Sequence, residues 1–163
     1  MEKEKKASTK NVIEIDYDNE DKRAYFKENF AIIRRSAGWS AEKFASLIGV
    51  SRQTINNIEH RQNKLTKSLY ILSRTIVDNE IRKNPEDTIM TKLILDAFVD
   101  KREDFSDEER REIKNNAEKL TLAVVDKPEN RKTVSVALVA TVAATVAVVG
   151  TAMGILIKSL FKK

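Results

Sequence analysis

Residues 134–157 contain no charged side chain, and this uncharged run constrains the fold more than any other feature of the chain. A helix of 24 residues, with a rise of about 1.5 Å per residue, is about 36 Å long and can cross a hydrocarbon core of about 30 Å. Arg131 and Lys132 precede the run and three lysines follow it. We therefore expect a single transmembrane helix within a C-terminal anchor, residues 131–163.

Two other placements of the uncharged run stay open. It could be a buried helix of a soluble oligomer, but the rest of the chain is small and charged and offers little to cover it. It could also lie in the membrane interface with its basic ends on anionic lipid, since a cytosolic N-terminus sends Lys158, Lys162 and Lys163 outside, against the positive-inside tendency. The spacing of Gly150 and Gly154 favours close packing of two spanning helices.

Composition favours an all-α fold. Two prolines and four glycines leave little material for the turns of a β fold. The absence of cysteine excludes disulfides and thiolate metal sites, and a single histidine, His60, excludes a multi-histidine site. We expect no metal, no cofactor and no small-molecule substrate. The acidic residues of the middle segment fall at helix starts rather than in a pocket-forming pattern, so we do not expect an enzyme.

Charge alternates along the chain and suggests four segments. Residues 1–21 are polar and acidic without periodicity, which predicts a disordered arm. They contain no apolar stretch, so the N-terminus is expected to stay in the cytoplasm. Residues 22–82 carry a basic excess suited to a polyanion, and residues 83–130 an acidic one in a helical linker or oligomerisation region. Residues 131–163 form the anchor with its basic flanks.

Apolar spacing predicts a compact set of helices in residues 22–82. The first helix presents Phe26, Phe30, Ile33 and Ala37 on one face and ends at Gly38. Ser40, Ser51 and Thr66 are suited to cap the next three helices. The predicted inward positions of the second and fourth helices are Phe44, Leu47 and Ile48, and Leu69, Leu72 and Ile76.

The third of these helices presents a polar outer face. With Ile55 and Ile58 inward, the outward side chains are Arg52, Gln53, Asn56 and Asn57. Arginine pairs with guanine, and glutamine or asparagine pairs with adenine, in the major groove. Two short helices joined by a glycine turn are a unit used to read DNA. The alternative is that these residues only solvate a surface helix.

Residues 30–59 resemble the XRE family of Cro and phage repressors. The resemblance lies in Arg34, Gly38, Phe44-Ala45, Gly49-Val50-Ser51 and Ile55-x-x-Ile58-Glu59. It implies a fold-fixing ion pair between Arg34 and Glu59 and base reading by Arg52, Gln53 and Asn56. Three positions depart from the family pattern: Ala41 replaces a glutamine, Arg61 replaces a glycine, and no proline precedes the fourth helix.

The resemblance and the charge pattern together predict a sequence-specific DNA-binding transcriptional regulator, most simply a repressor. It would act as a homodimer on double-stranded DNA, tethered by residues 134–157 to the cytoplasmic membrane as a single-pass protein with its DNA-binding domain in the cytoplasm. Two alternatives stay open: a small membrane protein whose helix-turn-helix contacts protein, and a soluble repressor with a C-terminal oligomerisation helix. The expected DNA contacts are Ser40, Lys43, Ser51, Arg52, Gln53, Thr54, Asn56, Asn57, Arg61, Lys64 and Lys67.

The middle segment is predicted to hold two more helices. Asn84-Pro85-Glu86-Asp87 is typical of a helix start, and Ser106 and Glu109 form the pattern of a capping box. The second helix carries an apolar stripe suited to a helical partner and to self-association. A ligand-sensing pocket in this segment is the alternative interpretation. Its members are Ile113, Ala117, Leu120 and Val124.

Overall fold

The computed structural model describes residues 16–60 and 63–145, and within these ranges every regular element is a helix. The N-terminal elements are α1 (Glu20–Glu28), α2 (Phe30–Ser36), α3 (Ala41–Ile48), α4 (Arg52–Glu59) and α5 (Lys67–Lys83). They are followed by α6 (Ile89–Leu95), a π-helical turn (Asp96–Asp100), a 3-10 turn (Arg102–Asp104), α7 (Asp107–Asp126), a second 3-10 turn (Pro128–Asn130) and α8 (Arg131–Thr145). The all-α prediction is confirmed for the described residues.

The first predicted helix is two helices. Asn29 ends α1 and begins α2 with φ −110° and ψ 12°, outside the helical region. Its side-chain amide donates to the Tyr25 carbonyl over 2.9 Å, beside a longer bond of 3.3 Å from its own backbone N–H to the same oxygen. The break turns the chain without losing the predicted inward positions, since Phe26, Phe30 and Ile33 are all buried.

Aromatic rings fill the core beneath the helix-turn-helix. The Phe26 ring lies edge-on to Phe30 and to Tyr70, with centroids 5.9 and 5.3 Å away. Trp39 stacks on Phe44 at 5.3 Å across the N-terminus of α3, which is the position of a hydrophobic staple. The predicted caps are also in place, because Ser40, Ser51 and Thr66 each accept a backbone N–H of the first turn of α3, α4 and α5.

Two predicted inward positions are wrong. Leu47 and Leu72 are 38 and 40% exposed. In α5 the buried side is formed by Tyr70, Ser73, Arg74 and Val77, so the helix is rotated from the predicted stripe. A buried arginine on this side is accommodated by charge: Arg74 donates to both oxygens of Asp78 and, over 2.7 and 2.6 Å, to both oxygens of Asp100.

The Arg74 cluster ties α5 to the π-helical turn. Burial alone would lower the pKa of Arg74, but the carboxylates of Asp100 and Asp78 outweigh burial and raise it. For Asp78 burial is the larger influence and raises the carboxyl pKa in spite of Arg74. The guanidinium therefore stays charged inside the domain, held by two acidic partners from different elements.

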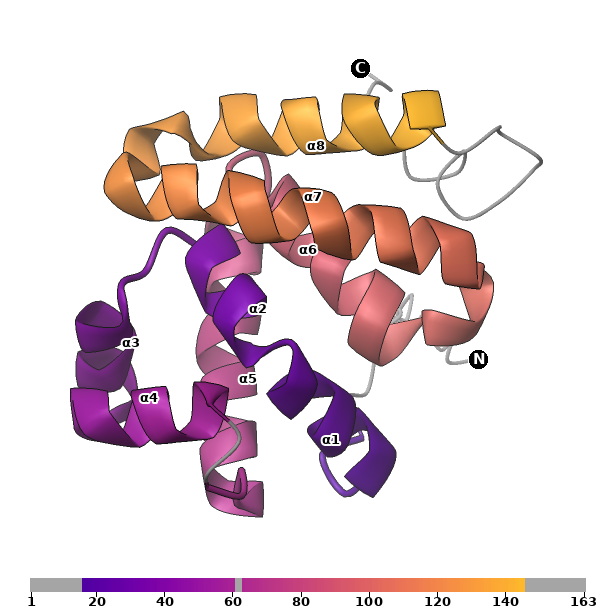
Figure 1. Cartoon of the computed structure of the whole chain (residues 1–163). Helices are drawn as coiled ribbons and strands as arrows, with labels where there is room; N and C mark the ends of the chain where they lie inside the picture. Colours follow the sequence, from indigo (N-terminus) through magenta and orange to yellow (C-terminus); the bar gives the residue numbers. More distant parts are fainter. Residues whose placement is uncertain (1–15, 61–62, 146–163) are drawn as a thin grey trace, which may run out of the picture.

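Helices α6 and α7 pack on α2, and α8 lies on the side of α7 away from α2 (Figure 1). α7 packs against both α2 and α8, and α6 packs against α2 and α8. The predicted stripe of α7 is buried at Ile113, Ala117 and Val124, but its partners are helices of the same chain. Residues 83–130 thus differ from a free linker in this structure, because their apolar side chains join one core with those of α1–α5.

The start of α6 differs from the prediction. Asn84 ends α5, the next four residues form turns, and α6 begins at Ile89 without a side-chain cap. The missing cap is supplied from α8, where the Ser135 hydroxyl accepts the Met90 N–H over 3.2 Å. The capping box at Ser106 and Glu109, in contrast, is present as predicted.

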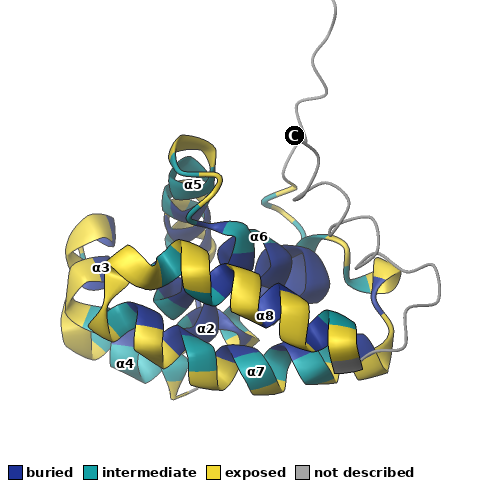
Figure 2. Ribbon diagram, turned by 90° about the horizontal axis from the view of Figure 1, so that it is seen from above, coloured by how far each residue is buried: buried dark blue, intermediate teal, exposed yellow. Residues whose placement is uncertain are grey.

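Helix α8 contains the first part of the predicted membrane span. Ser135, Leu138, Val139 and Val142 are buried against the domain, whereas Val136, Ala137, Ala140, Thr141 and Ala144 are exposed (Figure 2). The expectation that the rest of the chain cannot cover this run is therefore wrong for one side of α8. Among the described residues, no helix has both the length and the apolar character that a membrane crossing requires. Residues 146–157, with Gly150 and Gly154, lie outside the described ranges.

Basic side chains hold the start of α8 against the helix-turn-helix. Arg131 donates to the Ala37 carbonyl over 3.1 Å and to a Glu80 carboxylate oxygen over 2.7 Å. Gly38 makes room for this arginine, because a Cβ there would lie 3.1 Å from Arg131 Cδ, and its φ of 81° is a conformation that favours glycine. Lys132 pairs with Glu86 and lowers the pKa of that carboxyl.

Candidate nucleic-acid interface

The candidate interface is centred on α4. Gly49, with φ 70°, ends α3 in a left-handed turn, and Ser51 then caps α4 by accepting the Thr54 N–H over 3.1 Å. Ile55 and Ile58 are fully buried and fix the roll of the helix. This packing leaves Arg52 and Gln53 exposed at the N-terminal end, with Asn56 and Asn57 half-buried behind them.

Neighbouring side chains arrange the outer face of α4. The Gln53 side-chain amide donates to the Asn57 side-chain oxygen over 2.9 Å, one helical turn away. The Ser51 and Thr54 hydroxyls lie 2.9 Å apart, and Ser51 also holds the helix N-terminus. Arg52, in the first turn, is exposed. Amide and guanidinium donors at one end of an exposed helix have the chemistry that reads base edges.

An ion pair fixes α4 against α2. Arg34 Nε donates to Glu59 Oε1 over 2.7 Å, and its second terminal nitrogen donates to Glu59 Oε2 over 3.1 Å. The remaining nitrogen donates to the Trp39 carbonyl over 2.5 Å. Both side chains are about nine-tenths buried, at 8 and 11% exposed. One arginine thus joins the end of α4, the end of α2 and the turn before α3.

Cations border α4 on the side of the next loop. Lys64 and Lys67 are exposed, while Arg61, a further predicted contact, lies outside the described residues. On α3, Ser40 and Lys43 are exposed at the helix N-terminus, with the Lys43 N–H bonded to the Ser40 hydroxyl over 3.0 Å. Exposed lysines and helix N-termini are the groups that contact phosphate in protein–DNA complexes.

Two basic side chains of α1 border the same region, and the sequence pattern did not predict them as DNA contacts. Arg23 and Lys27 line a groove of about 350 Å³ together with Lys64, Glu20 and Asp21. Periodicity could not place them, because it does not show which face of α1 meets the loop after α4. The basic excess of residues 22–82 is the sequence signal that included them.

His60 ends α4 and has no metal-site neighbours. Its Nδ1 lies 2.7 Å from the Asn56 carbonyl oxygen, and the residue is exposed. Among the described residues, no cluster of three or more histidine, cysteine or acidic side chains could hold a metal ion.

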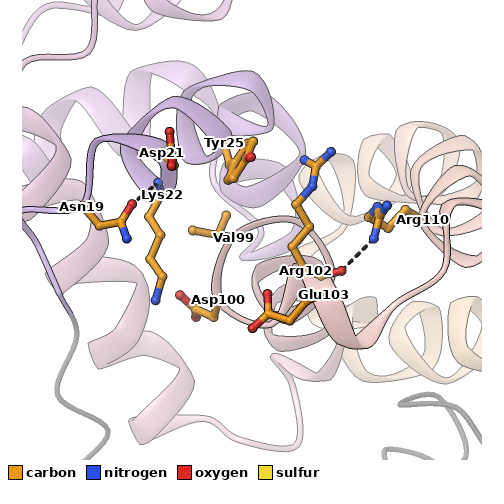
Figure 3. Close-up of a pocket in the computed structure, with 9 residues that line it drawn as sticks. All are labelled: Asn19, Asp21, Lys22, Tyr25, Val99, Asp100, Arg102, Glu103 and Arg110. Atoms are coloured by element: carbon orange, nitrogen blue, oxygen red, sulfur yellow. Dashed lines mark hydrogen bonds between the residues drawn. The ribbon is translucent and has the colours of Figure 1, made fainter.

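A separate pocket of about 470 Å³ lies between α1, the π-helical turn and the start of α7 (Figure 3). Arg102 lies over the Tyr25 ring, 4.4 Å from its centroid. Asp100 is engaged by Arg74, and Arg110 donates to the Arg102 carbonyl. The lining carries equal numbers of acidic and basic side chains, so it has no net charge that would select an anion or a cation.

Comparison with known proteins gives one result for this region. Residues 31–72 match the helix-turn-helix family model, of XRE type. The matched residues cover most of α2, all of α3 and α4 and the beginning of α5. A search of curated proteins and a search of solved structures found no match to the chain. The helix-turn-helix match suggests a DNA-binding regulator, and the matching family is generally not enzymatic.

Proposed function

We propose that this protein is a sequence-specific transcriptional regulator that reads duplex DNA with α4. The observation that carries the proposal is the outer face of α4, where Arg52 and Gln53 are exposed, together with the exposed Lys64 and Lys67 that follow α4 inside the matched region. Arg52 and Gln53 have base-reading chemistry, and the lysines supply contacts to the backbone. The rigid Arg34–Glu59 pair supports the proposal because it holds the reading helix at a fixed angle.

The proposed active form is a homodimer that acts as a repressor by occupying its site. Two copies would set two α4 helices in successive major grooves, about one helical turn of DNA apart. Two considerations support a dimer. One eight-residue helix presents only a small reading surface, and helix-turn-helix dimers bind operators whose two half-sites are related by two-fold symmetry. The stripe on α7 is unavailable for this contact while it packs on α2 and α8.

Selection of bound duplexes from a random pool by the full chain tests the DNA proposal. We expect an enriched sequence with two related half-sites, and an affinity that falls steeply with salt because lysine and arginine displace counterions. A pool that stays random after several rounds, with no salt-dependent binding, would overturn it.

We also propose that the C-terminal segment attaches the protein to the cytoplasmic membrane, with the DNA-binding helices in the cytoplasm. The support is the uncharged run, which continues from the exposed side of α8 through residue 157. Docked α8 limits how this attachment can occur. Residues 146–157 number 12 and would extend about 18 Å as a helix, less than the bilayer core of about 30 Å.

Attachment therefore takes one of two forms. With α8 docked, the remaining run can only enter the interface. A full crossing needs residues 134–157, and it would pull Leu138, Val139 and Val142 out of the domain core. Treatment of membranes with carbonate and with high salt separates these forms. A spanning helix stays in the membrane after both treatments, whereas a charge-held helix is released by high salt. A full chain that remains in the supernatant without detergent would overturn the membrane proposal.

A further inference from the structure

Residues 16–21, here called the acidic turn, fold back onto the start of α5. The Asp18 carboxylate pairs with the Lys67 ammonium, and the Tyr17 ring lies edge-on to Tyr70 with centroids 6.4 Å apart. Asn19 caps α1 by accepting the Lys22 N–H over 3.0 Å. The turn is thus held in place by a ring contact and a helix cap as well as by charge. This differs from the disordered arm predicted for these residues.

The acidic turn lies against the cations of the candidate interface. Lys67 is the first residue of α5, directly after the loop that leads from α4. Glu20 and Asp21 border the same groove as Lys64, Arg23 and Lys27. Three carboxylates, at positions 18, 20 and 21, therefore lie beside basic side chains of the candidate interface.

We propose that the acidic turn competes with DNA phosphates for Lys67, so that DNA binding requires release of Asp18; this inference rests on the DNA-binding function proposed above. A carboxylate and a phosphate make the same kind of charge-assisted bond to an ammonium. Both are also favoured at a helix N-terminus, which Lys67 begins in α5.

The exposure of the pair suits this role. The side chains of Lys67 and Asp18 are 52 and 77% exposed, so solvent screens their attraction and the pair exchanges easily. The neighbouring carboxylates remain close to the interface after release and repel phosphates over about 10 Å at moderate salt. The acidic turn would therefore weaken all DNA complexes and leave base preference unchanged.

The test compares DNA affinities of full-length variants on one selected duplex. Asp18→Asn should bind about two- to five-fold more tightly than the wild type at low salt, the range that an exposed ion pair supports. The gain should shrink as salt rises. Glu129→Gln is the matched control: it removes the same charge from the exposed turn between α7 and α8, and its affinity should stay near that of the wild type.

A Lys67→Met background shows whether the effect passes through Lys67. There, Asp18→Asn should give little or no gain. Equal affinities of Asp18→Asn and Glu129→Gln, with clear binding by the wild type, would overturn this inference and leave the proposed function intact. A full gain that persists in Lys67→Met would also overturn it. Absence of DNA binding by all variants would instead overturn the proposed function, and with it the competition.

Discussion

At the scale of single residues, two arginines of the helix-turn-helix serve different purposes. Arg34 is buried, and its guanidinium is paired inside the protein with the Glu59 carboxylate and the Trp39 carbonyl. Arg52 is exposed at the first position of α4. The difference follows from burial: a buried guanidinium must satisfy its donors inside the protein, whereas an exposed one keeps them for a ligand.

Arg52→Ala should relax base choice at one position of each half-site, at a cost of about 1–3 kcal/mol against the preferred base. Lys64→Ala is the matched comparison and should weaken binding to all sequences alike, since a phosphate contact carries no sequence information. Affinities for a panel of single-base operator variants measure both effects. An unchanged base preference in Arg52→Ala would make Arg52 a backbone contact instead.

Arg34→Met should lower the free energy of unfolding by about 3 kcal/mol, because it leaves the Glu59 carboxylate poorly solvated and without its partner. Arg23→Met is the control. It breaks an exposed pair with Glu20, at 3.4 Å, and should cost less than about 1 kcal/mol. Urea denaturation followed by circular dichroism compares them. Equal costs for the two variants would show that the buried pair adds nothing beyond a surface pair.

At the scale of elements, α8 completes the fold. Its Ser135 hydroxyl takes the place of the missing cap of α6, and its inward valines and leucine join the core. Arg131 and Lys132 fasten its start to α5 and to the turn before α6. An uncharged helix can therefore be a structural helix of the domain on one side and present an apolar surface on the other.

Val139→Ala should destabilise the protein by about 2 kcal/mol, because it removes two methyl groups that α8 buries against the domain. Val136→Ala makes the same chemical change on the exposed side of α8, where Val136 is 42% exposed, and should cost less than about 0.5 kcal/mol. Thermal unfolding of both variants gives the comparison. Similar small costs would indicate that α8 is undocked in solution.

At the scale of the whole molecule, α8 and the candidate interface lie on different sides. Figure 1 shows α8 along the upper edge of the molecule and α4 at its lower left, with α7 and α2 between them. Docking of α8 therefore leaves α4 uncovered.

A chain ending at Thr145 should keep the thermal stability of the full chain and lose membrane association, because it retains α8 and removes the second half of the uncharged run. A chain ending at Lys132 should instead unfold at lower temperature and aggregate, since it uncovers apolar side chains of α6 and α7. Fractionation and thermal unfolding of the two truncations measure this. Stability of the shorter chain equal to that of the longer one would contradict the structural role of α8.

The sequence by itself determined the local structure of the helix-turn-helix and the face of α4 that is directed outward. Caps at Ser40, Ser51 and Thr66, and the left-handed turn at Gly49, depend on interactions within a few residues, so spacing alone predicts them. The outward face of α4 follows equally from Ile55 and Ile58, because a short helix with two strong apolar positions has only one way to face the core.

Only the tertiary structure decided where the remaining surfaces go. The apolar periodicity of α5 could not show that Arg74 faces inward, because the buried arginine is stabilised by Asp100, which lies 26 residues away in the chain. Periodicity also could not show that α7 finds its partners in α2 and α8, or that one side of the first half of an apparent membrane span is covered by its own domain. The sequence of an apolar helix predicts that the helix is covered. Which surface covers it depends on contacts between residues distant in the chain.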